Sequence, residues 1–263
     1  MKIAFLGAGK MAGALIRGFL KAGLVRPDEV TAADIHHESL ESLAAGTGIL
    51  TASANADAVA GAEMVFLCVK PGDAGQALAT AALDRDQCLL VSIAAGVRVD
   101  TLRGMTECRR VVRVMPNTAA MVGLSATAVV ADPPATHSDI DLVEKFFSAV
   151  GTVVRISEQQ MDAVTALSGS GPAFCYLVME AMADGAVAAG LPRSLAYKLA
   201  GKTMAGAAKM AESNHPAVLR EMVTSPGGTT IAGLLELEQA GTRSAFARAI
   251  RAAAARSAEM SAK

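Results

Sequence analysis

Residues 2–12 read Lys-Ile-Ala-Phe-Leu-Gly-Ala-Gly-Lys-Met-Ala, and this stretch decides the fold of the chain. Its apolar start is expected to form a strand, and a helix is expected over about residues 10–22. In the G-x-G-x-x-A pattern between them, Gly7 permits a tight turn, Gly9 lets the backbone approach a pyrophosphate, and Ala12 lets the helix pack closely on the strand. An anion would rest on the helix N-terminus. The stretch therefore predicts dinucleotide binding.

Short apolar runs alternate with helical stretches from residue 1 to about residue 156. This alternation is typical of a parallel sheet with crossover helices. Strands are expected over residues 2–6, 30–33, 64–69, 89–92, 110–114, 126–130 and 152–156. The sequence therefore predicts an α/β fold with an N-terminal, Rossmann-like, doubly wound parallel sheet.

The second half of the chain has a different character. After Ser157 strand signals vanish, and stretches rich in Ala, Leu and Met predict four or five helices. We expect a dinucleotide-binding domain over residues 1–157 and an all-helical domain over residues 158–263. Several helices are apolar over more than one face, residues 196–210 among them, and such a helix must be buried all round. The helical domain is therefore expected to interlock with a second copy of the chain.

Composition excludes several function classes. Lys and Arg number 24 against 25 Asp and Glu, so no basic field attracts nucleic acid. The four cysteines show no C-x-x-C and the four histidines no H-E-x-x-H, so a metal site is not expected, and the cysteines are interpreted as small buried hydrophobic residues in a reducing cytoplasm. No signal peptide or uninterrupted run of roughly 20 apolar residues is recognised, so no membrane partner is expected.

Asp34 lies about 20 residues beyond the glycine loop, at the end of the second expected strand, where dinucleotide-binding folds contact the adenosine ribose. A carboxylate there hydrogen-bonds the 2′-hydroxyl and repels a 2′-phosphate, which favours NAD. Protonated His36 or His37 would partly offset that charge. Alternatively, Asp34 is the N-cap of the next helix. The residues leave the choice between NAD and NADP open.

Three further segments follow expected strands and should lie at the carboxyl edge of the sheet, where open α/β folds bind ligands. They are residues 68–71, residues 94–96 and residues 115–118. Small side chains in the second segment leave room for a nicotinamide and its ribose. Lys70 is interpreted either as a solvated charge or as a rigidly held ligand, and Asn117 either as a ligand or as the start of a turn.

Two segments stand out in the helical half. Residues 167–173 place two Gly and two Ser before an apolar helix, which is poor helix chemistry unless the backbone approaches a ligand or a partner helix closely. Residues 223–230 form a turn that feeds a helix beginning near Thr229. Its unpaired amides, glycines and hydroxyls would make a carboxylate receptor, although an ordinary helix start after a Pro-Gly turn looks similar.

Together these segments resemble the pyrroline-5-carboxylate reductase family. The resemblance spans nearly the whole chain and is carried by residues 7–12, 69–71, 92–96, 115–118, 167–173 and 224–230. The last two are highly specific, because the Ser-Pro-Gly-Gly-x-Thr run at residues 225–230 is the family's own signature. The glycine loop, by contrast, is shared by many dehydrogenases.

The resemblance implies a role for each matching residue. The dinucleotide, NADPH or NADH, would be held by Leu6, Gly7, Ala8, Gly9, Lys10, Met11, Asp34, Asn55, Cys68, Val69, Lys70, Pro71, Ala94, Ala95 and Gly96, with Asn117 as a further candidate. The substrate would be held by Glu158, Ser225, Gly227, Gly228, Thr229 and Thr230. Thr230 is the candidate catalytic residue, because its hydroxyl would lie near the ring nitrogen. Asn55, which the residues alone would make a helix cap, gains a role on the adenosine side.

The resemblance also implies the reaction. Hydride would pass from NAD(P)H to the C=N bond of 1-pyrroline-5-carboxylate, a small cyclic imino acid, and give L-proline in the last step of proline biosynthesis. The helical domain would bind substrate and form a cytoplasmic homodimer, which in many members assembles into rings. Two departures stand out: many members have a small hydroxyl residue at the position of Asp34, and some place an Asn at the position of Met222, so that contact is not transferred.

Two other classes of protein share some of these sequence features. Hydroxyacid dehydrogenases of a related two-domain type place a catalytic Lys in the first helix of the second domain, but none stands between Gly171 and Lys198. A redox-sensing or scaffold protein would bind NAD(P)H without turnover, and only an assay separates it from a reductase. The lack of an obvious catalytic His beside an Asp fits an imine, because an imine can enter already protonated.

Overall fold

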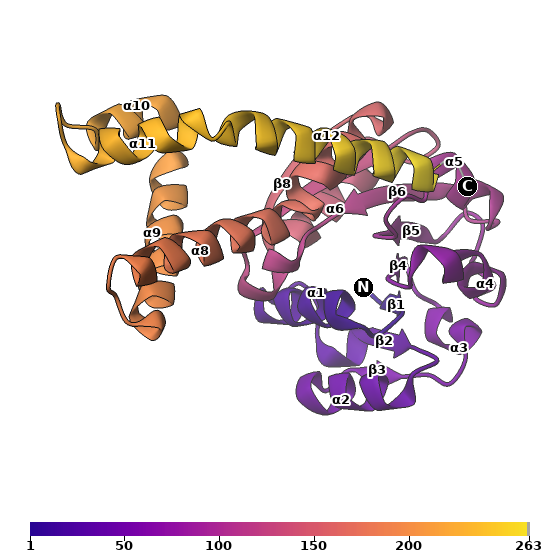
Figure 1. Ribbon diagram of the computed structural model, residues 1–263. Coiled ribbons are helices and arrows are strands. Elements are labelled where there is room, and N and C mark those ends of the chain that lie inside the picture. Colours follow the sequence, from indigo (N-terminus) through magenta and orange to yellow (C-terminus); the bar gives the residue numbers. More distant parts are fainter. Residues whose placement is uncertain (262–263) are drawn as a thin grey trace. The chain divides into compact units, whose positions relative to one another are not determined.

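One sheet organises the N-terminal part of the chain in the computed structural model, which describes residues 1–261 (Figure 1). The strands are β1 (Ile3–Leu6), β2 (Val30–Ala33), β3 (Leu50–Thr51), β4 (Met64–Leu67), β5 (Leu89–Ser92), β6 (Arg110–Met115), β7 (Ser125–Ala131) and β8 (Gly151–Arg155). They lie in the order β3-β2-β1-β4-β5-β6-β7-β8. The seven predicted strands are all present with small differences at their ends, and only the two-residue β3 was not expected.

One neighbouring pair departs from a purely parallel sheet. β7 runs antiparallel to β6, whereas the other neighbours pair parallel. The connection between them runs from Met115 to Ser125 and holds only the 3-10 helix η3 (Thr118–Val122). A parallel crossover needs about a dozen residues or more, so this shorter connection turns the chain back instead. The sheet is therefore mostly parallel.

Helices cover both faces of the sheet, as a doubly wound fold requires. One face, which carries Ile3 and Phe5, packs against α1 (Lys10–Lys21), α2 (His37–Thr47) and α6 (His137–Ser148). The other face, which carries Ala4 and Leu6, packs against α3 (Asn55–Val59), α4 (Ala74–Ala79) and α5 (Val99–Gly104). Burial on both faces explains why the strands read as continuous apolar runs.

A cluster of phenylalanines fills the first of these faces. Phe5 stacks on Phe66 with ring centroids 4.6 Å apart, and Phe19 meets Phe146 edge to face at 4.9 Å. With Phe147, five of the seven phenylalanines of the chain gather here, all of them buried. The core therefore depends on aromatic packing between α1, α6 and the sheet, although aromatic residues are only 3% of the chain.

Register aligns the carboxyl ends of the parallel strands. Leu6 pairs with both Ala33 and Leu67, Leu67 pairs with Ser92, and Ser92 pairs with Arg113. These residues form one row across five strands, and Ala33, Leu6, Leu67 and Ser92 each end a strand. The segments that follow them emerge together at one edge, which we call the rim.

Helices make up the rest of the described chain. They are α7 (Met161–Val164), the π-helical segment η5 (Thr165–Gly169), α8 (Gly171–Ala188), α9 (Arg193–Ala211), α10 (Pro216–Met222), α11 (Thr229–Gln239) and α12 (Thr242–Ser261). Up to residue 261 no strand follows β8, which confirms the all-helical second half. Unit 1 comprises Met1–Ser170 and the segment that begins at Ala252, whereas unit 2 comprises Gly171–Arg251. The domain boundary between residues 157 and 158 stays a prediction.

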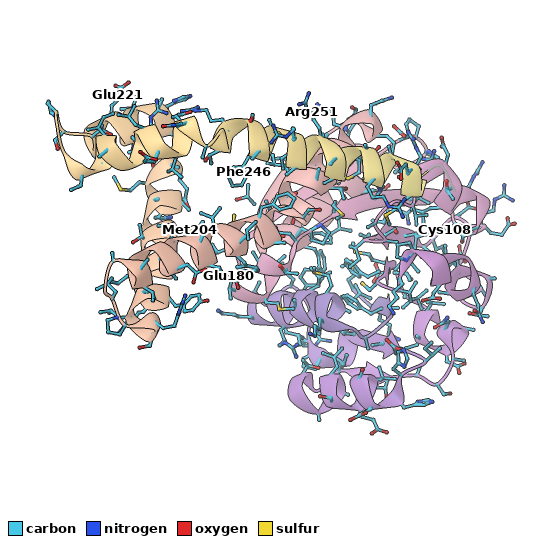
Figure 2. The ribbon with its side chains drawn as sticks, in the orientation of Figure 1. Cys108, Glu180, Met204, Glu221, Phe246 and Arg251 are labelled. Atoms are coloured by element: carbon cyan, nitrogen blue, oxygen red, sulfur yellow. The ribbon has the colours of Figure 1, made fainter. Side chains whose placement is uncertain are left out.

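Unit 2 buries few of its own side chains. Between residues 171 and 251 the buried apolar residues are Ala183, Ala196 and Ala200. Large apolar side chains along these helices are exposed: Tyr176, Leu177, Met182, Leu191, Leu195, Tyr197, Leu199, Met210, Val218, Met222, Val223, Leu235, Leu237 and Phe246. Figure 2 draws them as sticks and labels Phe246 on α12. As expected, the helices of unit 2 do not cover their own apolar surface.

The four cysteines are all free thiols. Cys88 and Cys108 are buried, Cys68 is half-buried and Cys175 is exposed on the chain. The interpretation of the cysteines as buried hydrophobic residues therefore fits the first two and is wrong for Cys175. Over residues 1–261 no His, Cys, Asp or Glu cluster of three or more could hold a metal ion. In the same range no helix has the length and apolar character needed to cross a membrane.

Candidate active site

The glycine loop joins β1 to α1 at the centre of the rim. Gly7 has φ of +101°, a conformation that side chains rarely adopt. A Cβ at Gly7 would lie only 2.9 Å from the carbonyl carbon of Cys68, at the end of the neighbouring β4. Glycine is therefore required at this position both by the backbone conformation and by the adjacent strand.

The N-terminus of α1 is open for a ligand. Gly9 is its N-cap, and no side chain accepts a hydrogen bond from the first turn. A Cβ at Gly9 would meet no atom of the protein within 4 Å. The protein itself does not require glycine there, whereas a ligand resting on the helix amides would need that space. Gly9, the exposed Lys10 and the half-buried Met11 thus fit a pyrophosphate at this turn.

Asp34 is tied to the glycine loop. Its Oδ2 accepts a hydrogen bond from the Ala8 amide at 2.6 Å, and its Oδ1 accepts one from the His36 amide at 2.8 Å. His36, not Asp34, is the N-cap of α2, so the alternative interpretation of Asp34 as that cap is wrong. From Asp34 to Thr47 the sequence contains no Lys or Arg. In the described residues the Asp34 carboxylate forms these two amide hydrogen bonds and no salt bridge, and its contact with a ribose stays a prediction.

The ends of β4 and β5 supply the next part of the rim. Cys68, Val69, Lys70 and Pro71 follow β4, and Lys70 is exposed at the start of a short 3-10 helix. Burial raises the pKa of the Cys68 thiol above its usual range. The thiol is therefore neutral at ordinary pH and is not a nucleophile.

The loop that follows β5 contains Ala94, Ala95 and Gly96. Ala94 is buried, and Gly96 has φ of +76°. A Cβ at Gly96 would lie 3.2 Å from the Cβ of Met260, in the last turn of α12. The C-terminal turn of the described chain therefore packs on this loop, an arrangement that sequence reasoning did not foresee.

Asn117 forms two side-chain hydrogen bonds in the connection after β6. Its Oδ1 accepts a hydrogen bond from the Ala119 amide at 3.1 Å, and its Nδ2 donates to the Ser168 carbonyl at 3.0 Å. The residue thus caps η3 and also joins it to the glycine-rich segment. At Gly169 a Cβ would lie 2.7 Å from Cε of Met115, so the close approach expected of this segment is to Met115. A ligand contact of Asn117 stays a prediction.

Asn55 is the first residue of α3, after the N-cap Ala54. Its Nδ2 donates to Thr80 Oγ1 at 2.9 Å and to the Ala77 carbonyl at 3.3 Å. The expectation that it caps a helix is therefore wrong, because its amide group joins α3 to the end of α4. Its role on the adenosine side stays a prediction.

Glu158 is the first residue of the 3-10 helix η4 (Glu158–Gln160). Its Oε1 accepts a hydrogen bond from Nη1 of Arg113, and Nε of Arg98 lies 3.8 Å from the same oxygen. Only 13% of the Glu158 side chain and 3% of the Arg113 side chain are exposed. Sequence reasoning missed Arg113, although a charged residue inside the apolar run 110–115 is a signal that such a side chain needs a buried partner.

The loop 223–230 forms the turn and the helix start that its sequence predicts, whereas its role as a carboxylate receptor stays a prediction. The Gly228 amide donates to the Ser225 carbonyl at 3.1 Å, and Gly227 has φ of +64°, which suits a type II turn with Pro226. A Cβ at Gly228 would lie 2.3 Å from Ser225 Oγ and 3.2 Å from the Ser225 carbonyl oxygen, so a larger residue there would displace the Ser225 hydroxyl. Gly228 is the N-cap of α11, and its first turn, which begins with Thr229 and the half-buried Thr230, receives no side-chain cap.

The structure therefore brings the cofactor candidates of the glycine, β4 and β5 loops together in unit 1, whereas Asn55 bonds to the end of α4 and Asn117 to the glycine-rich segment. Gly7, Asp34 and Cys68 each directly follow a strand of the rim, and the other candidates of the glycine, β4 and β5 loops flank them. Glu158 belongs to the same unit, whereas the loop 223–230 belongs to unit 2. The individual ligand contacts of these residues stay predictions.

Comparisons with known proteins cover the whole chain. Residues 158–260 match the family model described as pyrroline-5-carboxylate reductase dimerisation, and residues 2–96 match that of NADP oxidoreductase, coenzyme F420-dependent. The pyrroline-5-carboxylate reductase of Methanosarcina acetivorans is 46% identical, over 100% of this chain and 98% of the relative. That of Escherichia coli is 37% identical, over 95% of this chain and 94% of the relative.

Solved structures agree with these relatives. The pyrroline-5-carboxylate reductase of Coxiella burnetii has a TM-score of 0.93 and 33% identity, covering 99% of this chain and 98% of that one. The pyrroline carboxylate reductase of Plasmodium falciparum, solved with NADP bound, has a TM-score of 0.89 and 29% identity with the same coverage. The chain belongs to the pyrroline-5-carboxylate reductase family.

Proposed function

We propose that this chain is an NAD(P)H-dependent reductase that converts 1-pyrroline-5-carboxylate into L-proline. The observation that carries the proposal is the turn at residues 225–228, which presents the uncapped N-terminus of α11. It occurs in a chain that also has a dinucleotide loop at the rim of its sheet. Family membership makes the imine the expected substrate.

The residues at the rim suit a nicotinamide dinucleotide. The open space over Gly9 and the first amides of α1 would hold the pyrophosphate. Asp34 would lie at the adenosine ribose, and the small residues Ala94 and Ala95 would leave room for the nicotinamide ring. When bound, the dinucleotide supplies a hydride from C4 of its nicotinamide.

The loop 223–230 suits the substrate carboxylate. The amides at the start of α11 and the Ser225 hydroxyl would donate to it, and a charge-assisted hydrogen bond of this kind contributes about 1.5–3 kcal/mol. Thr230, in the first turn, would place its hydroxyl at the ring nitrogen. In this arrangement the carboxylate fixes the position of the ring, and the hydroxyl fixes its rotation.

The chemistry then needs little acid catalysis from the protein. A protonated C=N group accepts the hydride at carbon, its π electrons move to nitrogen, and a neutral amine results. The chain's contribution is to hold the two reactants within about 3–3.5 Å of each other and to exclude water. This fits a site in which Thr230 is the candidate catalytic residue and no strong acid is needed.

The reductase acts as a homodimer in this proposal, through the exposed apolar helices of unit 2, and dimers assemble further into rings. The match of residues 158–260 to a dimerisation model supports self-association. The enzyme would work in the cytoplasm, where its free cysteines remain reduced.

Light scattering tests the dimer. It should give twice the 26.8 kDa chain mass or a multiple of it, because monomers would leave the apolar surface of unit 2 in water. A single species of monomer mass would contradict the dimer.

Coenzyme oxidation tests the reaction. Purified protein, 1-pyrroline-5-carboxylate and either NADPH or NADH should lose nicotinamide absorbance. The substitution Asp34→Ser should shift the NADPH-to-NADH ratio of kcat/KM upward by about fivefold or more, because two like charges about 4 Å apart repel by about 1 kcal/mol even in water. Asp86→Ser, which removes an equal charge near the start of β5, is the matched control and should leave the ratio unchanged.

Two outcomes of this assay would contradict the proposal. If both coenzymes bind but neither is oxidised by any imine or keto acid, the chain is a binding protein and the reductase proposal fails. If oxidation occurs but Asp34→Ser leaves the ratio unchanged, the carboxylate does not face the ribose 2′ position.

Removal of the Thr230 hydroxyl tests its proposed role. Thr230→Val should lower kcat by about 10- to 100-fold, the worth of one charge-assisted hydrogen bond, with little effect on coenzyme affinity. Thr230→Ser keeps the hydroxyl and should retain most of the activity. Thr242→Val, at the start of α12, is a control for the loss of a Thr at a helix N-terminus. An unchanged kcat in Thr230→Val would refute the role.

A further inference from the structure

Arg113 is a buried cation immediately beneath the rim. It lies on β6 and pairs in register with Ser92, the last residue of β5. The chain that follows Ser92 is the loop assigned above to the nicotinamide. Only 3% of the Arg113 side chain is exposed, so its charge has lost almost all contact with water. A guanidinium in this position needs a carboxylate, which Glu158 provides across 45 residues of sequence.

The ion pair is incomplete. Arg113 donates to Glu158 Oε1 through Nη1, but its Nη2 and the Oε2 of Glu158 are both buried without a partner in the described structure. Arg–carboxylate pairs often form two parallel hydrogen bonds, which satisfy both atoms on each side. Here one donor and one acceptor remain, and each buried unsatisfied polar atom is destabilising.

Stability alone does not account for such a pair. The cost of removing two charges from water offsets most of their attraction, and apolar side chains of similar size often replace a buried pair without loss of stability. Arg98 already places a second guanidinium beside the same oxygen, at 3.8 Å and with 47% of its side chain exposed. Arg98 therefore contributes positive charge from the solvent side, whereas the buried Arg113 can fix the orientation of the Glu158 carboxylate.

We propose that Arg113 is a positioning residue of the reductase. It holds the Glu158 carboxylate in one orientation beside the nicotinamide loop, so that the carboxylate can stabilise the protonated C=N group of the substrate. This inference rests on the proposed function, because the position of Glu158 near the reactants comes from the family resemblance. The role of Arg113 comes from its burial, its register and its single hydrogen bond.

The chain contains a matched control on the same strand. Arg110 also pairs with a buried carboxylate, that of Asp139, at 2.9 Å. It is the first residue of β6, at the opposite end from the rim. Arg110→Met therefore removes an ion pair of the same strand without touching the nicotinamide loop, although Arg110 is more exposed than Arg113. We expect it to lower the melting temperature while leaving kcat within about twofold of the wild type.

The test compares Arg113→Met, Arg113→Lys, Glu158→Gln and the double variant Arg113→Met/Glu158→Gln. Both Arg113 substitutions should lower kcat about 100-fold, the effect of displacing a reacting group by about 1 Å, while the Kd of NADH measured by its fluorescence changes little. Lys keeps the buried charge but cannot fix the plane of a carboxylate, so it should not restore kcat. In the Glu158→Gln background, Arg113→Met should lower kcat by less than a further factor of about two.

Each other outcome overturns the proposal. A wild-type kcat in Arg113→Met or Arg113→Lys shows that Glu158 needs no fixed orientation, and a full additional loss in the double variant shows that Arg113 acts independently of Glu158. If Arg113→Met does not fold, Arg113→Lys carries the test. Absence of turnover in the wild type would overturn the proposed function and this inference with it, whereas turnover together with an unaffected Arg113→Lys would overturn this inference alone.

Discussion

The in-register pairing of the parallel strands is the constraint on which the candidate site depends. Because Ala33, Leu6, Leu67 and Ser92 form one row, the chain leaves four strands at the same edge. Register is strongly specified here, since both faces of the sheet are buried and a slip of one residue would exchange every side chain between two different cores. The packing of the phenylalanine cluster against one face therefore also fixes the position of the rim.

Helix N-termini supply the polar chemistry of the proposed site. The N-caps of α1 and α11 are Gly9 and Gly228, and neither helix receives a side-chain cap. By contrast, α6 is capped by the Thr136 hydroxyl, which accepts a hydrogen bond from the Asp139 amide. A side-chain cap occupies one of the first amides of a helix, whereas an uncapped first turn leaves all of them for water or an anion. The helices α2, α5 and α9 also lack a side-chain cap, so a missing cap alone does not mark a ligand site. At α1 and α11 the N-cap is also a glycine, which allows the close approach that the proposed pyrophosphate and carboxylate need.

Sequence reasoning was effective where the relevant physics is local. The glycine loop, the strand ends and the start of α11 near Thr229 all depend on residues a few positions apart, and all are confirmed. Partners far apart in sequence were not predictable: Arg113 meets Glu158 45 residues away, and Asn117 meets Ser168 51 residues away. The strand β7 was predicted but its antiparallel direction was not, because the direction follows from the length of a connection and not from an apolar pattern.

In the proposed reaction this site delivers a hydride to a C=N carbon. The most direct measurement uses coenzyme carrying deuterium at the transferable position of C4 and follows the product by mass spectrometry and NMR. We expect L-proline with one deuterium at C5, the former C=N carbon, in proportion to the coenzyme oxidised. Coenzyme oxidation without deuterated proline, or deuterium at another position, would contradict it.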